Sequence, residues 1–180
     1  MGSLAALLFA GLLAGGGGEP SIQKLAIALN GRQILVSFEL VDGFGAELRE
    51  RIESGLPTGF VYELQLMRDR AHWWDRYLDS SRIDVDAMYN AVTHEYLVNT
   101  KHDGKLIDSR TLRDEGELRR AMTQFTAVPA FVLQESSRRE RYLVRVRVEL
   151  GTSQVLGFIP FQTTTPWIES NKVRGVDPPL

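Results

Sequence analysis

Apolar and polar side chains alternate along three stretches of this chain, residues 33–41, 59–70 and 141–150. A period of two places successive side chains on opposite faces of a β-strand. In the first stretch, for example, Val36 falls on the apolar face and Ser37 on the polar face. Each stretch is therefore expected to form a strand with one face packed on a core and the other in water.

Hairpin turns are expected to join several of these strands. Asn30-Gly31 precedes the first stretch, and this dipeptide favours a tight two-residue turn because both residues tolerate a positive φ angle. A second hairpin is expected between residues 90–99 and 105–109. Hairpins make the strands that they join antiparallel.

Two helical patterns interrupt the strands. After Asp42, which can act as a cap, apolar residues recur at helical spacing until Gly55. A second helix is expected to begin after Thr111 or Asp114 and to end at Pro129. These elements predict an α+β fold, a mainly antiparallel sheet or sandwich with two amphipathic helices. The helix, proline and strand recur in the same order, so an internal duplication of hairpin-helix-strand units is one interpretation.

The composition limits the partners that such a domain attracts. The 180 residues carry a formal net charge of -2, and we expect no nucleic-acid binding because that requires a positively charged surface. The chain has no cysteine, which excludes disulfides, thiolate metal sites and a thiol nucleophile. A single domain over residues 19–180 fits this length.

Residues 1–18 form a distinct N-terminal hydrophobic segment. Residues 4–14 are apolar without interruption, and four glycines follow them. A helix that crosses a bilayer needs roughly 20 apolar residues, so a cleaved signal peptide is favoured over a retained anchor, although no Lys or Arg precedes the apolar core. We expect an exported protein, periplasmic or facing the periplasm, that contacts the membrane only if this segment is retained. A buried N-terminal helix before a flexible linker is the alternative.

The sequence offers little catalytic chemistry. His94 is not followed four residues later by a second histidine, so the helix motif of zinc proteases is absent. No serine lies in a Gly-x-Ser-x-Gly turn. We therefore predict no catalytic residue, no metal site and no cofactor. A hydrolase built around His72, with Asp69 and Asp75, is the least favoured alternative.

Two groups of residues remain as candidate binding surfaces. The first group consists of Arg68, Arg70, His72, Trp73, Trp74 and Asp75. Tryptophan beside arginine is typical of protein interfaces, and two consecutive rings on a strand would point to opposite faces. The second group is Arg145 and Arg147, on the last long strand. These two either form an anion-binding strip or pair across strands with acids such as Glu39 or Glu63.

Several short motifs of this chain are also found together in one known family. They are the strand 34–40, the helix end at 53–57, the stretch from Arg68 to Asp75, residues 89–98 and Trp167. In these motifs the chain resembles the bacterial family called domain of unknown function 4390, in which residues 89–98 would form the central strand. The resemblance implies export through an N-terminal hydrophobic segment, and it brings no catalytic residues.

These observations favour a non-enzymatic envelope domain that binds a protein partner or senses a small ligand through the first group of residues. The alternative is a carrier of an apolar ligand held between the sheet and the helices. Such a carrier requires a cavity larger than a packing defect.

Overall fold

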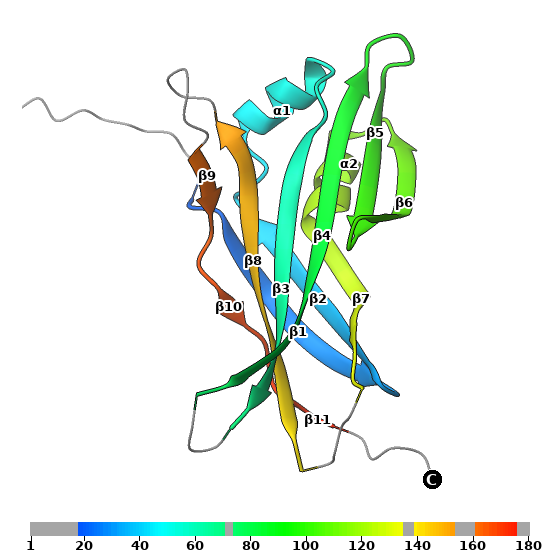
Figure 1. The fold of residues 1–180 in the computed structure, drawn as a ribbon. Coiled ribbons are helices and arrows are strands. Elements are labelled where there is room, and N and C mark those ends of the chain that lie inside the picture. Colours follow the sequence, from blue (N-terminus) through cyan, green and yellow to red (C-terminus); the bar gives the residue numbers. More distant parts are fainter. Residues whose placement is uncertain (1–17, 71–73, 135–138, 154–160, 176–180) are drawn as a thin grey trace, which may run out of the picture.

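Two antiparallel sheets face each other in the computed structural model, which describes residues 18–70, 74–134, 139–153 and 161–175 (Figure 1). The smaller sheet has the strand order β1-β2-β7. The larger sheet has the order β10-β8-β3-β4-β5-β6, and β9 and β11 also pair with β8. The predicted α+β class with a mainly antiparallel sandwich is confirmed. The strands are β1 (Ser21–Asn30), β2 (Gln33–Val41), β3 (Thr58–Asp69), β4 (Arg76–Asn90), β5 (Glu95–His102), β6 (Lys105–Leu112), β7 (Gln124–Val132), β8 (Arg141–Ser153), β9 (Phe161–Thr164), β10 (Ile168–Glu169) and β11 (Val173–Arg174).

The first hairpin forms as predicted, with its turn one residue further along the chain. Asn30 pairs with Gln33, so Gly31 and Arg32 are the two central residues of the turn. Gly31 has a φ angle of 59°, and a positive φ at the first central position suits the right-handed twist of a hairpin. The glycine therefore decides where the turn falls, and Asn30 remains in the strand.

The first helix, α1 (Ala46–Glu53), follows this hairpin and ends as the sequence predicts. Gly55, just beyond it, has a φ angle of 81°, the left-handed conformation that glycine adopts without strain. The predicted cap at Asp42 is wrong, because the helix begins after Gly45 and has no side-chain cap. Ile52 is the fully buried residue of this helix.

The second helix, α2 (Glu115–Thr123), begins as predicted and ends earlier. Asp114 caps it by accepting a hydrogen bond from the Glu117 N–H at 2.9 Å. The predicted end at Pro129 is wrong, because β7 starts directly after Thr123 and contains this proline. An edge strand tolerates proline because the missing N–H would face away from the neighbouring strand.

The central hairpin of the larger sheet differs most from the sequence prediction. β4 is a strand of 15 residues, and it is followed by a turn at residues 91–94. The segment 90–99, predicted as one continuous strand, is therefore divided between the end of β4, this turn and β5. His94 lies in the turn with a φ angle of 56°, so it is not on a strand.

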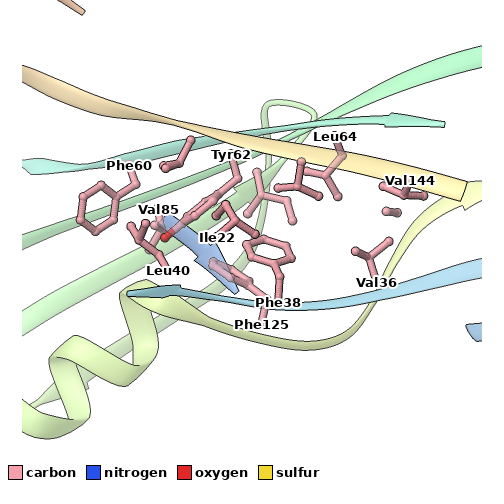
Figure 2. Packing of buried hydrophobic residues seen from close by; sticks show 14 of the residues in the cluster. Ile22, Val36, Phe38, Leu40, Phe60, Tyr62, Leu64, Val85, Phe125 and Val144 are labelled. Carbon is pink, nitrogen blue, oxygen red and sulfur yellow. The ribbon is translucent and has the colours of Figure 1, made fainter. Parts of the chain in front are cut away.

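The core lies between the two sheets and beneath the helices. Phe38 of β2 and Phe125 of β7 meet Tyr62 of β3, with ring centroids between 4.9 and 5.1 Å apart (Figure 2). The Tyr62 hydroxyl donates a hydrogen bond of 2.8 Å to the Met122 carbonyl oxygen at the end of α2. Tyr62 has no exposed surface, and burial raises its pKa well above the usual value. These rings connect both sheets to α2.

The last described segment, residues 161–175, closes one side of the sandwich and is called the tail here. β9, β10 and β11 pair in turn along the outer edge of β8. The Asn171 side chain accepts a hydrogen bond from the Ile27 N–H at 2.8 Å and donates one to the Ile27 carbonyl oxygen at 3.1 Å. The tail thus connects β8 of the larger sheet with β1 of the smaller one.

The order of hairpin, helix and strand occurs twice along the chain, as the duplication interpretation requires. The strand after α1, β3, lies inside the larger sheet, whereas the strand after α2, β7, lies at the edge of the smaller sheet. The two units therefore do not occupy equivalent places in the fold. The predicted N-terminal segment, residues 1–18, lies outside the described residues except for Gly18.

Candidate functional site

The β3–β4 hairpin carries the first group of residues that the sequence singles out. Its tip lies between Asp69, the last residue of β3, and Arg76, the first residue of β4. Trp74 in this tip is 92% exposed, and Tyr77 at the start of β4 is 51% exposed. His72 and Trp73 lie outside the described residues, so the prediction that the two tryptophans face opposite sides stays a prediction.

Two arginines accompany these rings at the tip. Arg70 and Arg76 are exposed, and neither guanidinium has a hydrogen bond or an ion pair within the described parts of the chain. The Arg70 N–H donates a hydrogen bond of 3.3 Å to the Asp75 side chain across the tip. We call Arg70, Trp74, Arg76 and Tyr77 the tip surface. The sequence analysis missed Arg76 and Tyr77, although both residue types are common at interfaces.

Arg68 belongs to the same hairpin but its charge is already paired. It contacts Glu140, which also accepts a hydrogen bond of 2.5 Å from the Tyr142 hydroxyl. The hydrogen bond from Tyr142 lowers the pKa of Glu140, and Arg68 lowers it further. Burial and the contact with Glu140 raise the pKa of Tyr142 to about 12. Arg68 therefore holds the end of β8 and is not part of the tip surface.

The raised pKa of Tyr142 predicts a loss of stability at high pH. Above pH 10 the unfolded chain releases the phenol proton, whereas the folded chain retains it up to about pH 12. The free energy of unfolding should therefore fall as the pH rises through this window. Urea titrations at pH 9 and pH 11.5 measure the loss, and Tyr142→Phe should show a smaller decrease than wild type. An equal decrease in both proteins would contradict the assignment.

The second predicted group, Arg145 and Arg147, lies on the outer face of the larger sheet. The two guanidinium carbons stand 4.9 and 4.6 Å from the ring centroid of Trp167, a residue of the tail. Arg147 also forms an ion pair of 2.6 Å with Glu63, and Arg145 donates a hydrogen bond of 2.9 Å to Gln65. These arginines hold the tail and pair across strands.

The predicted cross-strand pairing is confirmed for Glu63 and wrong for Glu39. Glu39 lies in the smaller sheet, where it forms an ion pair of 2.7 Å with Lys24. Burial would raise the pKa of Glu63, but its hydrogen bonds with Arg147 and Glu149 hold it below the usual value. Burial, together with the hydrogen bond to Glu63, raises the pKa of Glu149.

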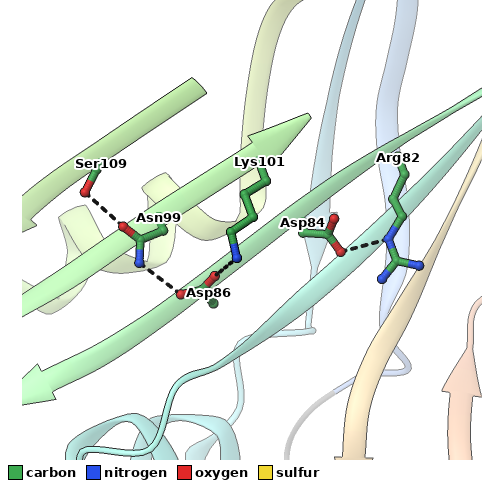
Figure 3. Close-up of polar contacts among 6 residues, drawn as sticks. All are labelled: Arg82, Asp84, Asp86, Asn99, Lys101 and Ser109. Carbon is green, nitrogen blue, oxygen red and sulfur yellow. Dashed lines mark hydrogen bonds and ion pairs between the residues drawn. The ribbon is translucent and has the colours of Figure 1, made fainter. Parts of the chain in front are cut away.

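Further polar pairs cover the same outer face towards β6. Arg82 donates to Asp84 at 2.8 Å, and Asp86 contacts Lys101 at 3.7 Å and accepts from Asn99 at 3.1 Å (Figure 3). Asp84 and Asp86 thus face basic or amide side chains. Opposite charges on neighbouring strands contribute a few tenths of a kcal/mol per pair, so this face is a solvated, self-neutralised surface.

The two predicted groups do not form one surface. Arg68 pairs in register with Tyr142, whose ring points into the core. Arg145 stands three residues further along β8, so it points to the opposite face of the sheet. Arg68 and the arginines around Trp167 therefore lie on opposite faces of the larger sheet.

The two acidic residues of the hydrolase alternative, Asp69 and Asp75, make structural contacts. The Asp69 side chain is 6% exposed and contacts two cations, Lys172 of the tail at 3.0 Å and Arg141 at 2.7 Å. The hydrogen bond from Lys172, together with the charge of Arg141, holds the pKa of Asp69 below its usual value. Its carboxylate therefore anchors the tail, and Asp75 closes the hairpin tip. His72 lies outside the described residues.

A serine, a histidine and an aspartate meet elsewhere, where β5 ends against β4. The Ser81 hydroxyl lies 2.7 Å from His102 Nε2, and an Asp103 carboxylate oxygen lies 3.5 Å from the same nitrogen. In a catalytic triad the acid holds Nδ1 while the serine contacts Nε2. Here Ser81 and Asp103 both approach Nε2 of His102, and Ser81 is buried. This group therefore joins two strands and does not present a nucleophile.

Residues 18–70, 74–134, 139–153 and 161–175 contain no group of three or more His, Cys, Asp or Glu side chains placed to hold a metal ion. No helix in these ranges is both long enough and apolar enough to span a bilayer.

The fold and the tip define an antiparallel two-sheet domain with two helices and an exposed aromatic hairpin end. The chain belongs to the family "Domain of unknown function (DUF4390)", whose model matches residues 18–162. The match ends near the start of the tail, within β9. No curated protein and no solved structure matched in the corresponding comparisons.

Proposed function

We propose that this chain is an exported, non-enzymatic domain that binds a protein partner of the cell envelope through its tip surface. The supporting observation is the 92% exposure of Trp74 beside Tyr77 and two arginines without partners in the described chain. Large aromatic and arginine side chains contribute most of the binding free energy at protein interfaces. Covering an exposed aromatic ring at the end of a long hairpin removes apolar surface from water, which makes binding of a partner favourable.

Export is the second part of this proposal, and it is supported by the apolar run in residues 4–14. A run of this length matches the hydrophobic core of a signal peptide better than a bilayer span. The domain from residue 19 onwards would then work outside the cytoplasmic membrane, and its partner would be an envelope protein.

One experiment tests both parts. The full chain carrying a C-terminal tag is expressed in its source cells, which are fractionated before the tagged protein is captured and its companions are identified by mass spectrometry. We expect the domain in the envelope fraction together with a specific partner. Trp74→Ser should weaken binding of that partner by about 30-fold, which corresponds to the roughly 2 kcal/mol typical of a hot-spot residue.

Val92→Ser is the matched control, because Val92 is 89% exposed and lies in the turn at the other end of β4. This variant should retain the partner, and both variants should keep the thermal midpoint of wild type. Equal capture by Trp74→Ser would refute the tip surface. Recovery of the intact chain from the cytosol, with Met1 attached, would refute export.

A further inference from the structure

A cleft of about 570 Å³ opens on the side of the sandwich away from the tail. Its lining comes from β5, from β6 at the edge of the larger sheet, from β7 at the edge of the smaller sheet and from α2. Figure 1 shows β6, β7 and α2 on the side away from β9 and β10. Its size falls within the range of ligand-binding pockets, which is roughly 300–1,000 Å³. The lining is Thr100, Ile107, Asp108, Arg110, Leu112, Glu117, Arg120, Ala121, Gln124, Phe125, Thr126 and Val128.

Only one of the two open sides of the sandwich is covered by a described segment of the chain. On the β1–β8 side the tail runs between the sheets as an extended segment, with Ile168 and Val173 packed against the core. Its polar side chains bind backbone groups, as Asn171 does with Ile27. On the β6–β7 side the described chain supplies no such segment, and Ile107 and Val132 on the two edge strands are about half exposed.

A hydroxyl group in the cleft has no partner among the described residues. Thr100 of β5 is 8% exposed and lines the cleft, and its side chain has no hydrogen bond within the ranges that the structure describes. The Thr100 hydroxyl oxygen is open to the cleft, and a few such polar groups orient the ligand in a binding pocket. A donor or acceptor supplied by a bound molecule would satisfy this hydroxyl.

The charges at the rim are only partly paired. Arg110 forms an ion pair of 2.6 Å with Asp108, so these two charges neutralise each other. Glu117 and Arg120, one turn apart on α2, have no ion pair among the described residues. The rim thus offers one free carboxylate and one free guanidinium, and a complementary ligand carries one charge of each sign.

We propose that this cleft binds an extended segment of another polypeptide. The segment presents apolar side chains at alternate positions to the floor around Phe125 and Leu112, an acidic side chain to Arg120 and a basic one to Glu117. Polypeptide backbone supplies both donors and acceptors, one of which reaches the Thr100 hydroxyl. The tail already occupies the opposite side of the same sandwich as an extended segment, although it pairs there with the backbone of β8.

The composition of the lining favours a peptide over a small apolar ligand. Seven of the twelve lining side chains are polar or charged, which suits a chain of alternating character. The contact is made mainly by side chains, because Pro129 removes one backbone donor from the free edge of β7.

The test uses a phage-displayed library of random nine-residue peptides, selected on the full chain. Ala121→Trp fills the cleft, and its circular dichroism and thermal midpoint verify that it folds. Arg120→Glu reverses an exposed charge without adding volume, so it tests the cleft with little effect on packing. Enriched peptides are synthesised with fluorescein, and their binding is measured by fluorescence anisotropy.

We expect enriched peptides to share alternating apolar positions and an acidic residue, and to bind Ala121→Trp and Arg120→Glu at least about tenfold more weakly. Replacing that acidic residue of the peptide by lysine should restore binding to Arg120→Glu. Trp74→Ser should bind these peptides as wild type does, so a failure at the tip surface is distinguishable from a failure here.

Three results would overturn the proposal. One is the absence of any enriched peptide, and another is equal binding by Ala121→Trp. The third is binding of dansyl-undecanoate to wild type but not to Ala121→Trp, without enriched peptides, which would assign the cleft to a small amphipathic ligand.

Discussion

Gly59→Ala should destabilise the domain by about 3 kcal/mol or more, because there is no room for a methyl group at this position. A Cβ atom built on Gly59 would lie 1.8 Å from the Val85 carbonyl oxygen and 2.8 Å from the Asp86 Cα. Both atoms belong to the backbone of β4, so no side-chain rotation relieves the overlap. The two strands would have to separate where Gly59 pairs with Asp86.

Gly45→Ala is the matched control. Gly45 has a φ angle of -91°, and nothing lies within 4 Å of a Cβ built there. This variant should stay within about 1 kcal/mol of wild type, the range of a weakened helix cap. Urea titration measures both variants, and insoluble Gly59→Ala beside soluble Gly45→Ala counts as the same result. A Gly59→Ala protein as stable as its control would mean that β3 and β4 do not approach this closely.

The Gly59→Ala substitution is also expected to affect binding at the tip surface. β3 and β4 form the hairpin whose far end carries Trp74. A change in the pairing of these strands at Gly59 would propagate along the hairpin, because a shift of one residue turns every side chain to the other face. Any soluble Gly59→Ala protein is therefore expected to bind the tip partner less well.

The sequence predicted individual elements better than their pairing. In residues 33–41 the alternation identified the buried face of β2 correctly, since Ile34, Val36 and Phe38 are at most 3% exposed. The sequence does not predict β4 as one strand, because its regular alternation of apolar and charged residues begins only at Ile83, after a first half with no such alternation. Pro129 indicates a helix end in the sequence, because the sequence alone does not reveal that this proline lies on an edge strand.

The candidate site could be predicted only in part, because the pairing of strands is not visible in the sequence. Composition alone marked the stretch from Arg68 to Asp75, and Trp74 is indeed exposed there. An arginine has an ion-pair partner only if strand pairing brings an acidic residue next to it. Strand pairing in turn depends on contacts between residues that are distant in the sequence. Arg68 meets Glu140, and Arg147 meets Glu63 and Trp167. No local pattern reveals these partners, and the cleft also forms only when separate strands come together.

The aromatic contact between the sheets should be the most sensitive part of the core. Phe38 is 3% exposed, and its ring centroid lies 5.1 Å from that of Tyr62 and 4.9 Å from that of Phe125. These three rings belong to three strands in two sheets. Removing the Phe38 ring leaves a cavity that neither sheet can fill without moving relative to the other.

Phe38→Ala is therefore expected to lower the free energy of unfolding by about 3–5 kcal/mol, a large part of the 5–15 kcal/mol typical of a domain. Phe44→Ala should cost clearly less, because Phe44 is only partly buried beside α1. Urea titration measures both. Phe125 also lines the cleft, so Phe38→Ala should weaken peptide binding there while leaving capture at the distant tip surface intact. A loss below 1 kcal/mol, or equal losses for the two variants, would mean that Phe38 does not hold the sheets together.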